Sequence, residues 1–374
     1  MDVTQPGFAI EDLAPAHVRA IAPYVPGKPI AETARELGIA ESDILKMASN
    51  ENPLGASPRA VEALRGALAQ LHYYPDGSGY DLKAAISRKL GVKPAMLVLG
   101  NGSNDVLELA ARAFVRSGET VVFSRHAFLV YPLVAQAIGA VPVEVPARAY
   151  GADLDAMAKA LRADTKMVFL ANPNNPTGTF SPWDDVRRFV ERVPAKVLVV
   201  LDEAYGEYLP PELASPTPTW IKRFPNLIVS RTLSKAYGLA GLRVGFGIAD
   251  PRVAEVMNRV RQPFNVNHLA MVAATAALDD DAFIAKSRAV NAAGLVQLAQ
   301  GFAKLGLEYI PSRGNFIAVR VGDAKHVYEA LLRDGVIVRP IAGYGLPEHL
   351  RVTVGLAEHN ARFLASLARA LGRG

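Results

Sequence analysis

With 374 residues, half of them hydrophobic, the chain is long enough for two domains or one large lobed domain with a sizeable core. Its 41 basic and 36 acidic side chains give a formal net charge of +5 without the basic stripe typical of nucleic-acid-binding proteins, and the lack of cysteine excludes disulfides and thiolate metal sites. Residues 1–6 lack the features of a signal peptide and no apolar run has the length of a membrane span, so we expect a soluble cytoplasmic protein.

The N-terminal region is rich in proline and alanine. The stretch from Ala22 to Pro29 contains three prolines and can be neither a regular helix nor a central strand. We expect residues 1–44 to form an arm together with part of a small domain, residues 45–262 to form a large domain, and residues 263–374 to form a small C-terminal domain.

From Ala95 onward, short apolar runs alternate with amphipathic stretches of helix length. This alternation predicts an α/β fold with a mostly parallel sheet covered by helices. The expected strands are 96–99, 120–123, 167–170, 197–201, 227–229 and 244–248. Four of these runs are followed by polar clusters, at 101–104, 172–178, 202–205 and 232–235. Because ligands bind beyond the carboxyl ends of strands in such sheets, we expect these clusters to form one site.

After residues 262–265 the pattern changes to a long alanine-rich helix, expected over 268–305 with breaks. Strands are then predicted at 315–321, 336–339 and 350–354, with a helix at 327–334. Together they predict a compact α+β unit at the C-terminus.

Lys235 is the most informative candidate for chemistry. A lysine attacks or holds an aldehyde only when its amine is neutral, which requires burial or neighbouring positive charge. Thr232, Ser234 and Arg243 lie nearby in the sequence, and two hydroxyls with a guanidinium suit a phosphate dianion. This pattern indicates a lysine that forms a Schiff base beside a phosphate site.

Asp202 follows five apolar residues and so would enter a cleft from a buried strand, where it needs a cationic partner. The pyridinium nitrogen of a lysine-bound pyridoxal phosphate is such a partner; a structural aspartate at a turn is the alternative. Tyr205 and Asn175 can each donate a hydrogen bond to the ring oxygen of that cofactor. Asn175 and its neighbour Asn174 can equally be turn residues.

Three further groups have both a binding and a structural interpretation. Backbone amides at 102–104 can bind phosphate at a helix start, while Ser103 can instead be an N-cap. Phe128 and Tyr131 can stack on an aromatic cofactor or belong to the core. Arg339 and Arg351 alternate with apolar residues on short strands, so each faces either an anionic substrate or solvent.

Several ordered motifs extend these observations to nearly the whole chain. They are residues 23–29 (PYVPGKP), 49–55 (SNENPLG), 74–77 (YPDG), 100–103 (GNGS), 174–178 (NNPTG), 202–205 (DEAY) and 232–243 (TLSKAYGLAGLR). With them the chain resembles the pyridoxal-phosphate-dependent aminotransferases of the aspartate aminotransferase fold, and within that family the histidinol-phosphate aminotransferases. The resemblance implies fold type I, with a mostly parallel seven-stranded sheet sandwiched by helices in the cofactor-binding domain and a smaller α+β domain.

The resemblance also implies roles for residues around the cofactor. Lys235 would be the Schiff-base residue and proton carrier, Asp202 would lie on the pyridine nitrogen, and Asn175 with Tyr205 would lie on the ring hydroxyl. The cofactor phosphate would be held by Thr232, Ser234, Arg243 and the amides of Gly102, Ser103 and Asn104. Many relatives carry Asp-Glu where this chain has Asn104-Asp105, which leaves the side-chain contribution at that point uncertain.

The remaining implied roles concern the ring face, the substrate and a partner subunit. Phe128 matches the aromatic residue that stacks on the pyridine ring. Tyr74 matches a tyrosine that reaches the cofactor phosphate of the neighbouring subunit, which implies a homodimer with shared sites. Arg351 matches the arginine that binds the α-carboxylate, while Tyr24 and Arg339 match contacts to the distal phosphate of the substrate.

The expected reaction is transamination between histidinol phosphate or imidazole acetol phosphate and glutamate or 2-oxoglutarate, in histidine biosynthesis, with no nucleic-acid or membrane partner. An aromatic amino acid aminotransferase and a pyridoxal-phosphate decarboxylase of a phosphorylated amino acid remain alternatives. A non-catalytic ligand sensor or DNA-binding regulator is disfavoured, because the resemblance leaves no segment for a helix-turn-helix domain.

Overall fold

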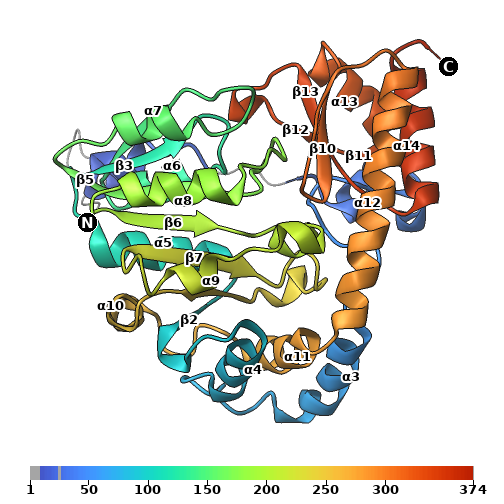
Figure 1. Cartoon of the computed structure of the whole chain (residues 1–374). Helices are drawn as coiled ribbons and strands as arrows, with labels where there is room; N and C mark the ends of the chain where they lie inside the picture. Colours follow the sequence, from blue (N-terminus) through green and yellow to red (C-terminus); the bar gives the residue numbers. More distant parts are fainter. Residues whose placement is uncertain (1–8, 24–26, 374) are drawn as a thin grey trace, which may run out of the picture.

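The computed structural model describes residues 9–23 and 27–373, which form a large lobe and a smaller one (Figure 1). The chain begins with short helical segments, η1 (Ile10–Leu13) and α1 (Ala16–Arg19), followed by α2 (Ile30–Leu37) and η2 (Glu41–Asp43). Ala34 of α2 packs with Ile44, Ala48 and Ile337, so this region contributes to the small lobe. No helix in the described part of the chain is long and apolar enough to cross a membrane.

The large lobe is built on a seven-stranded sheet in the order β2-β8-β7-β6-β5-β3-β4. Its strands are β2 (Leu97–Gly100), β3 (Thr120–Ser124), β4 (Val141–Val145), β5 (Thr165–Ala171), β6 (Leu198–Asp202), β7 (Leu227–Thr232) and β8 (Gly245–Ile248). Strand β8 runs antiparallel to both of its neighbours, β2 and β7, and the other four pairs in this sheet are parallel. The predicted α/β fold with a mostly parallel seven-stranded sheet is therefore confirmed.

Helices cover both faces of this sheet, as Figure 1 shows for α7 and α8 on one side and α5 on the other. The helices of this lobe are α3 (Pro58–Ala67), α4 (Tyr80–Leu90), α5 (Ser103–Phe114), α6 (Val130–Ala137), α7 (Leu154–Lys159), α8 (Trp183–Arg192), α9 (Thr217–Trp220), α10 (Pro251–Val260) and α11 (His268–Leu278). Short 3-10 segments are η3 (Leu68–Gln70), η4 (Pro94–Met96), η5 (Gly206–Tyr208), η6 (Pro211–Leu213) and η7 (Ala240–Leu242).

Successive side chains of each strand point to opposite faces of the sheet, so the core of the large lobe has two layers. In β5, Val168 and Leu170 join the layer formed with α7 and α8, whereas Met167 and Phe169 join the layer formed with α5, α6 and α10. Because successive strand side chains point to opposite faces, this alternation continues into the polar residues at the strand ends. It decides which of those residues enter the site.

Helix α12 (Asp281–Lys304) connects the two lobes and runs along one side of the molecule (Figure 1). Its first turn contributes Phe283 and Ile284 to the large-lobe core, and its last turns contribute Leu298 and Phe302 to the small-lobe core. The preceding α11 packs against α3 and α4. The change of lobe therefore lies within α12, later than the boundary near residue 263 that composition indicated.

The small lobe contains a four-stranded sheet in the order β12-β13-β10-β9 and a two-stranded sheet of β1 and β11. The strands are β1 (Leu45–Lys46), β9 (Tyr309–Ile310), β10 (Phe316–Arg320), β11 (Val336–Ile337), β12 (Arg339–Pro340) and β13 (His349–Thr353). Helices α13 (Ala324–Arg333) and α14 (Ala357–Ala370) and segment η8 (Ala342–Tyr344) complete it. The predicted strand 336–339 is thus two short strands in different sheets, because β11 pairs with β1 and β12 pairs with β13.

Candidate active site

A cavity of about 190 Å³ lies where strands β5, β6 and β7 end and the small lobe meets the large one. All four predicted polar clusters of the large lobe reach this region, and β12 and β13 of the small lobe close it. Its lining includes Ser103, Asn104, Phe128, Asn175, Asp202, Tyr205, Thr232, Ser234, Lys235, Arg243, Arg339 and Arg351. The structure therefore brings together most of the residues singled out from the sequence.

Lys235 lies just beyond β7 with its side chain partly buried in the cavity wall. Its Nζ donates a hydrogen bond to the carbonyl oxygen of Ser49 at 3.1 Å and lies 6.0 Å from the centre of the Tyr205 ring. Burial lowers the pKa of Lys235 to about 8, and the positive charges of Arg351 and Arg243 act in the same direction. This is the setting that a reactive lysine amine requires.

Asp202 ends β6 on the face that carries α6, and only 4% of it is exposed. Its Oδ2 accepts a hydrogen bond of 2.9 Å from Tyr131 Oη, whereas its buried Oδ1 has no partner among the described residues. Burial raises the pKa of Asp202 to about 6, although the hydrogen bond from Tyr131 opposes that rise. The carboxylate therefore presents one unsatisfied oxygen beside the cavity.

Tyr131 belongs to the core, which is one of its two interpretations from the sequence. Its ring is completely buried in α6 and stacks on Phe169, with centroids 4.7 Å apart and planes inclined by 6°. Stacking of Tyr131 on a cofactor is therefore excluded, because Phe169 covers the ring and its hydroxyl is directed at Asp202. Phe128 does line the cavity and meets Tyr131 edge-on.

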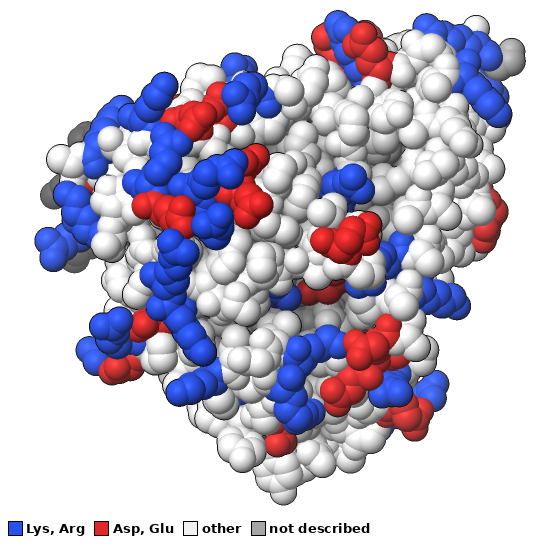
Figure 2. Space-filling view, in the orientation of Figure 1, with Lys and Arg blue, Asp and Glu red and all other residues white. Residues whose placement is uncertain are grey.

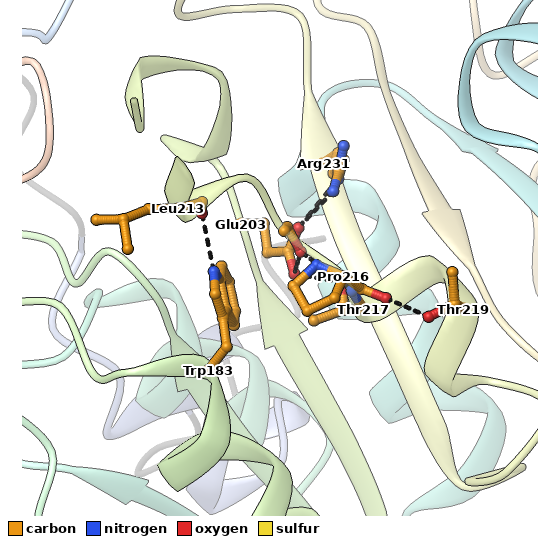
Figure 3. Close-up of polar contacts among 8 residues, drawn as sticks. Trp183, Glu203, Leu213, Pro216, Thr217, Thr219 and Arg231 are labelled. Carbon is orange, nitrogen blue, oxygen red and sulfur yellow. Dashed lines mark hydrogen bonds and ion pairs between the residues drawn. The ribbon is translucent and has the colours of Figure 1, made fainter. Parts of the chain in front are cut away.

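Glu203 points to the face of the sheet opposite Asp202, because it contacts Thr217 whereas Asp202 contacts Tyr131. Figure 3 shows Glu203 together with Arg231. The Glu203 carboxylate is fully buried and accepts hydrogen bonds from Arg231 Nη2 at 2.7 Å and Thr217 Oγ1 at 2.5 Å. A further bond comes from Ser215 Oγ at 2.8 Å. This buried ion pair connects the ends of β6 and β7 next to Asp202 and Thr232 in the sequence.

Arg243 packs so closely against Gly102 that no side chain fits at this position. A Cβ there would lie 2.4 Å from Arg243 Nη2, and the φ angle of 84° also favours glycine. Gly102 is the N-cap residue of α5 and Ser103 is its first helical residue, so the interpretation of Ser103 as an N-cap is wrong. Its backbone amide therefore lies at the helix start, where anions bind.

The side chains of Ser234 and Thr232 lie in the same corner as Arg243. Arg243 Nη1 donates to Ser234 Oγ at 3.2 Å, and Thr232 Oγ1 accepts from the Ser234 amide at 3.1 Å. The residues in this corner thus offer a guanidinium, hydroxyls and a helix start within one small volume.

The small lobe contributes Arg351, which faces inward. Its Nη1 donates to Asn175 Oδ1 at 2.6 Å and its Nη2 to the carbonyl oxygen of Ala48 at 2.8 Å. Its buried Nε has no partner in the part of the chain that the structure describes. The side chain of Arg339 also lines the cavity, close to Gly27. Both arginines are therefore directed at the site rather than at solvent.

Asn50 was not assigned a role from the sequence, although it lies in the motif at 49–55. Its Nδ2 donates a hydrogen bond of 2.9 Å to Tyr205 Oη, and the residue lines the cavity. Burial raises the pKa of Tyr205 to about 12, so its phenol stays protonated.

Asn174, which precedes Asn175 in the chain, donates to the carbonyl of His126 and to Thr177, which is the behaviour of a structural turn residue.

Among the predicted residues that the structure describes, Tyr74 lies away from this cavity. Tyr74 is 84% exposed and stacks on Phe264, with centroids 4.9 Å apart. Tyr24 lies outside the described residues. The assignment of Tyr74 to a neighbouring subunit remains a prediction.

A model of the family described as aminotransferase class I and II matches residues 42–371. The chain belongs to the class I and II aminotransferase family. This aminotransferase is 60% identical over 361 residues to histidinol-phosphate aminotransferase 2 of Nitrosospira multiformis, covering 96% of this chain and 92% of the relative. It is 60% identical over 358 residues to histidinol-phosphate aminotransferase 1 of Thiobacillus denitrificans, covering 96% and 93%.

Solved structures agree with the aspartate aminotransferase fold. The crystal structure of histidinol-phosphate aminotransferase from Sinorhizobium meliloti in complex with pyridoxal 5'-phosphate has a TM-score of 0.87 at 28% identity, covering 99% of both chains. Aspartate aminotransferase from Thermus thermophilus with maleate has a TM-score of 0.81 at 22% identity, covering 96% of this chain and 99% of the other, and supports the fold alone.

The cavity of this aminotransferase fits pyridoxal phosphate on its own chemistry. A buried carboxylate oxygen without a partner suits a protonated ring nitrogen, and the enclosed lysine suits an aldehyde. The corner of Gly102, Ser103 and Arg243 suits a phosphate, and the Arg243 guanidinium packs against Gly102 only because this residue lacks a Cβ.

Proposed function

We propose that this aminotransferase catalyses transamination between histidinol phosphate or imidazole acetol phosphate and glutamate or 2-oxoglutarate, with pyridoxal phosphate as cofactor. One observation carries the chemistry. The Lys235 amine, with its pKa lowered to about 8, lines the same cavity as Asp202 Oδ1 and Arg351 Nε, two buried atoms without a hydrogen-bond partner among the described residues. The substrate assignment is supported by relatives named histidinol-phosphate aminotransferase at 60% identity over almost the whole chain.

When bound, pyridoxal phosphate supplies an aldehyde for the amino group and a ring that accepts electrons from the substrate α-carbon. Asp202 would pair with the ring nitrogen, and Asn175 and Tyr205 would bond the ring hydroxyl. Phe128 would cover the ring face. The phosphate would be held by Thr232, Ser234, Arg243 and the amides at Gly102, Ser103 and Asn104.

Lys235 would hold the cofactor through its amine and, when displaced by the amino donor, would carry the α-proton. With a pKa of about 8, about one tenth of such amines are neutral at pH 7. That fraction is far larger than for an exposed lysine, so the amine can act as base and, after protonation, as acid. The carbonyl of Ser49 directs Nζ by its hydrogen bond.

Arg351 would bind the α-carboxylate of glutamate through its planar guanidinium, whose charge is opposite and whose Nε is free to donate. Arg339 and Tyr24 would contact the distal phosphate of histidinol phosphate. A guanidinium in the cavity wall suits this dianion better than it suits the uncharged ring of an aromatic amino acid. Arg339 is therefore the residue that would discriminate between the two donors.

We also propose a homodimer in which Tyr74 serves the neighbouring site. The stacked side chains of Tyr74 and Phe264 are exposed, as are Leu68, Leu71 and Tyr80 in the same region. Exposed apolar groups of this kind mark contacts with another protein chain.

On the face in Figure 2, acidic and basic side chains are interspersed, which suits small-molecule substrates rather than a nucleic acid.

A donor panel followed by cofactor absorbance tests this function. Histidinol phosphate and glutamate should convert the cofactor to its aminated form, and phenylalanine should do so at least about tenfold less efficiently. Lys235→Ala should abolish turnover, and Arg339→Leu should remove the preference for histidinol phosphate over phenylalanine. Equal use of phenylalanine by the wild type would favour an aromatic aminotransferase, and carbon dioxide release without an oxoacid acceptor would favour a decarboxylase.

A further inference from the structure

Residues 45–50 join the small lobe to the large-lobe site although they precede the large lobe in sequence. Strand β1 pairs with β11, the Met47 amide donates to the Ile337 carbonyl, and the Thr353 amide donates to the Met47 carbonyl. The chain then passes through the cavity wall. There the Ala48 carbonyl accepts from Arg351 and the Ser49 carbonyl accepts from Lys235.

Asn50 is the point at which this segment contacts Tyr205. It is only 1% exposed and has a φ angle of 56°, in the left-handed region that asparagine tolerates better than most residues. Its backbone is held by the small lobe, because its amide donates to Thr353 Oγ1 at 2.9 Å and its carbonyl accepts from Asn315 Nδ2 at 2.9 Å. Its side chain, in contrast, reaches Tyr205 of the large lobe.

The hydrogen bonds around Asn50 orient its side-chain amide between the two lobes. Thr353 Oγ1 accepts the Asn50 amide proton, so its own hydroxyl proton is available for Asn50 Oδ1, 3.2 Å away. In the structure the amide oxygen faces Thr353, and Nδ2 faces Tyr205 Oη at 2.9 Å. Because Nδ2 can only donate, Tyr205 Oη accepts from Asn50 and keeps its own proton for another acceptor.

We propose that Asn50 is a positioning residue that directs the Tyr205 hydroxyl proton into the cofactor cavity and couples this proton to the small lobe through Thr353. The proposal rests on the proposed function, since the acceptor is the ring hydroxyl oxygen of pyridoxal phosphate. A phenol that accepts one hydrogen bond donates a stronger one, because bonds in a chain polarise each other. A displacement of the small lobe that lengthens the contact with Thr353 would weaken the donation by Tyr205.

The pH titration of the cofactor absorbance in the holoenzyme tests this coupling. We expect Asn50→Gly, which keeps the left-handed backbone, to shift the midpoint in the same direction as Tyr205→Phe, by about 0.5 to 1 pH unit. In the Tyr205→Phe background the same change should shift it by less than about 0.2 unit, because the residue through which Asn50 acts is already lost.

A matched pair at position 353 tests the link to the small lobe and does not alter Asn50. Thr353→Val removes the hydroxyl and should shift the midpoint in the same direction as Asn50→Gly, whereas Thr353→Ser keeps it and should leave the wild-type value. Thermal unfolding of each variant separates this effect from a loss of stability. A lowered Tm with an unchanged midpoint in both Asn50→Gly and Thr353→Val would overturn the coupling.

The outcome also distinguishes this proposal from the function on which it rests. A wild-type protein that binds pyridoxal phosphate and transaminates, while Asn50→Gly keeps the wild-type midpoint, contradicts the role of Asn50 alone. A wild-type protein that binds no cofactor, or a Lys235→Ala variant that still turns over, contradicts the proposed function itself. Equal shifts by Asn50→Gly with and without the Tyr205 hydroxyl would show that Asn50 acts by another route.

Discussion

Replacing Tyr131 with phenylalanine removes one hydroxyl and with it the 2.9 Å hydrogen bond to Asp202 Oδ2. The ring itself stays stacked on Phe169, so the packing of α6 is preserved. A hydrogen bond to a buried carboxylate favours its ionised form by about 2 kcal/mol, which corresponds to about 1.5 pH units. The pKa of Asp202, already raised to about 6 by burial, therefore rises further in Tyr131→Phe.

This change makes cofactor binding more dependent on pH. The ring nitrogen pairs with the ionised carboxylate, so a protonated Asp202 must lose its proton before binding, and affinity is lost as the pH falls through the pKa of the free protein. Near pH 9 both proteins are ionised and should bind pyridoxal phosphate equally. Near pH 5 the variant should bind about 30-fold more weakly, and near pH 7 about fourfold more weakly.

The assay is the dissociation constant of pyridoxal phosphate for the two apoproteins between pH 5 and 9. Titrations of the cofactor itself cancel in the ratio of variant to wild type. Tyr208→Phe is the matched control, because Tyr208 is also buried but its hydroxyl accepts from Asn315 at 3.4 Å instead of bonding Asp202. A ratio for Tyr131→Phe that is the same at every pH would refute the role assigned to this hydrogen bond.

Three further changes have definite expected outcomes. Glu203→Ala leaves Arg231 buried without its partner and should lower the free energy of unfolding by about 3 to 5 kcal/mol in a denaturant titration of the apoprotein; a loss below about 1 kcal/mol would contradict the importance of this pair. Gly102→Ala places a Cβ against Arg243 and should weaken binding of pyridoxal phosphate by at least about tenfold but binding of unphosphorylated pyridoxal by much less. Arg351→Lys loses the planar fork and should raise KM for glutamate by about tenfold or more in steady-state kinetics, and an unchanged KM would mean that the carboxylate binds elsewhere.

The large-lobe sheet could be predicted because its strands are buried on both faces and appear as continuous apolar runs, such as 197–201 in β6. The edge strand β4 was missed for the same physical reason. In β4, Val141, Pro142 and Glu144 are exposed, so the segment has no apolar run and contains a proline that only an edge strand tolerates. Sequence pattern thus identifies the centre of such a sheet better than its border.

The sequence predicted most of the residues that line the candidate site, but it did not predict the contacts that determine their chemistry. Asp202 and Glu203 are adjacent acidic residues at the end of the same strand. The packing of α6 on one face of the sheet decides that Asp202 contacts Tyr131 while Glu203 contacts Arg231. The hydroxyl of Tyr131 lies 71 residues away from its acceptor along the chain. Asn50 illustrates the same limit, because its function depends on contacts with both lobes that no local pattern contains.

The arrangement around Arg351 is compatible with both a contact between the lobes and the proposed binding of a substrate carboxylate. Its Nη1 bonds Asn175 of the large lobe and its Nη2 bonds the Ala48 carbonyl, while Nε has no partner in residues 9–23 and 27–373. A carboxylate that approaches the edge formed by Nε and Nη2 leaves Asn175 on Nη1, and Nη2 has a second proton besides the one donated to the Ala48 carbonyl. Substrate binding therefore adds to the contact between the lobes instead of competing with it. The charge of Arg351 also lowers the pKa of Lys235, so neutralisation by the carboxylate should raise the basicity of the lysine amine when the α-proton must be removed.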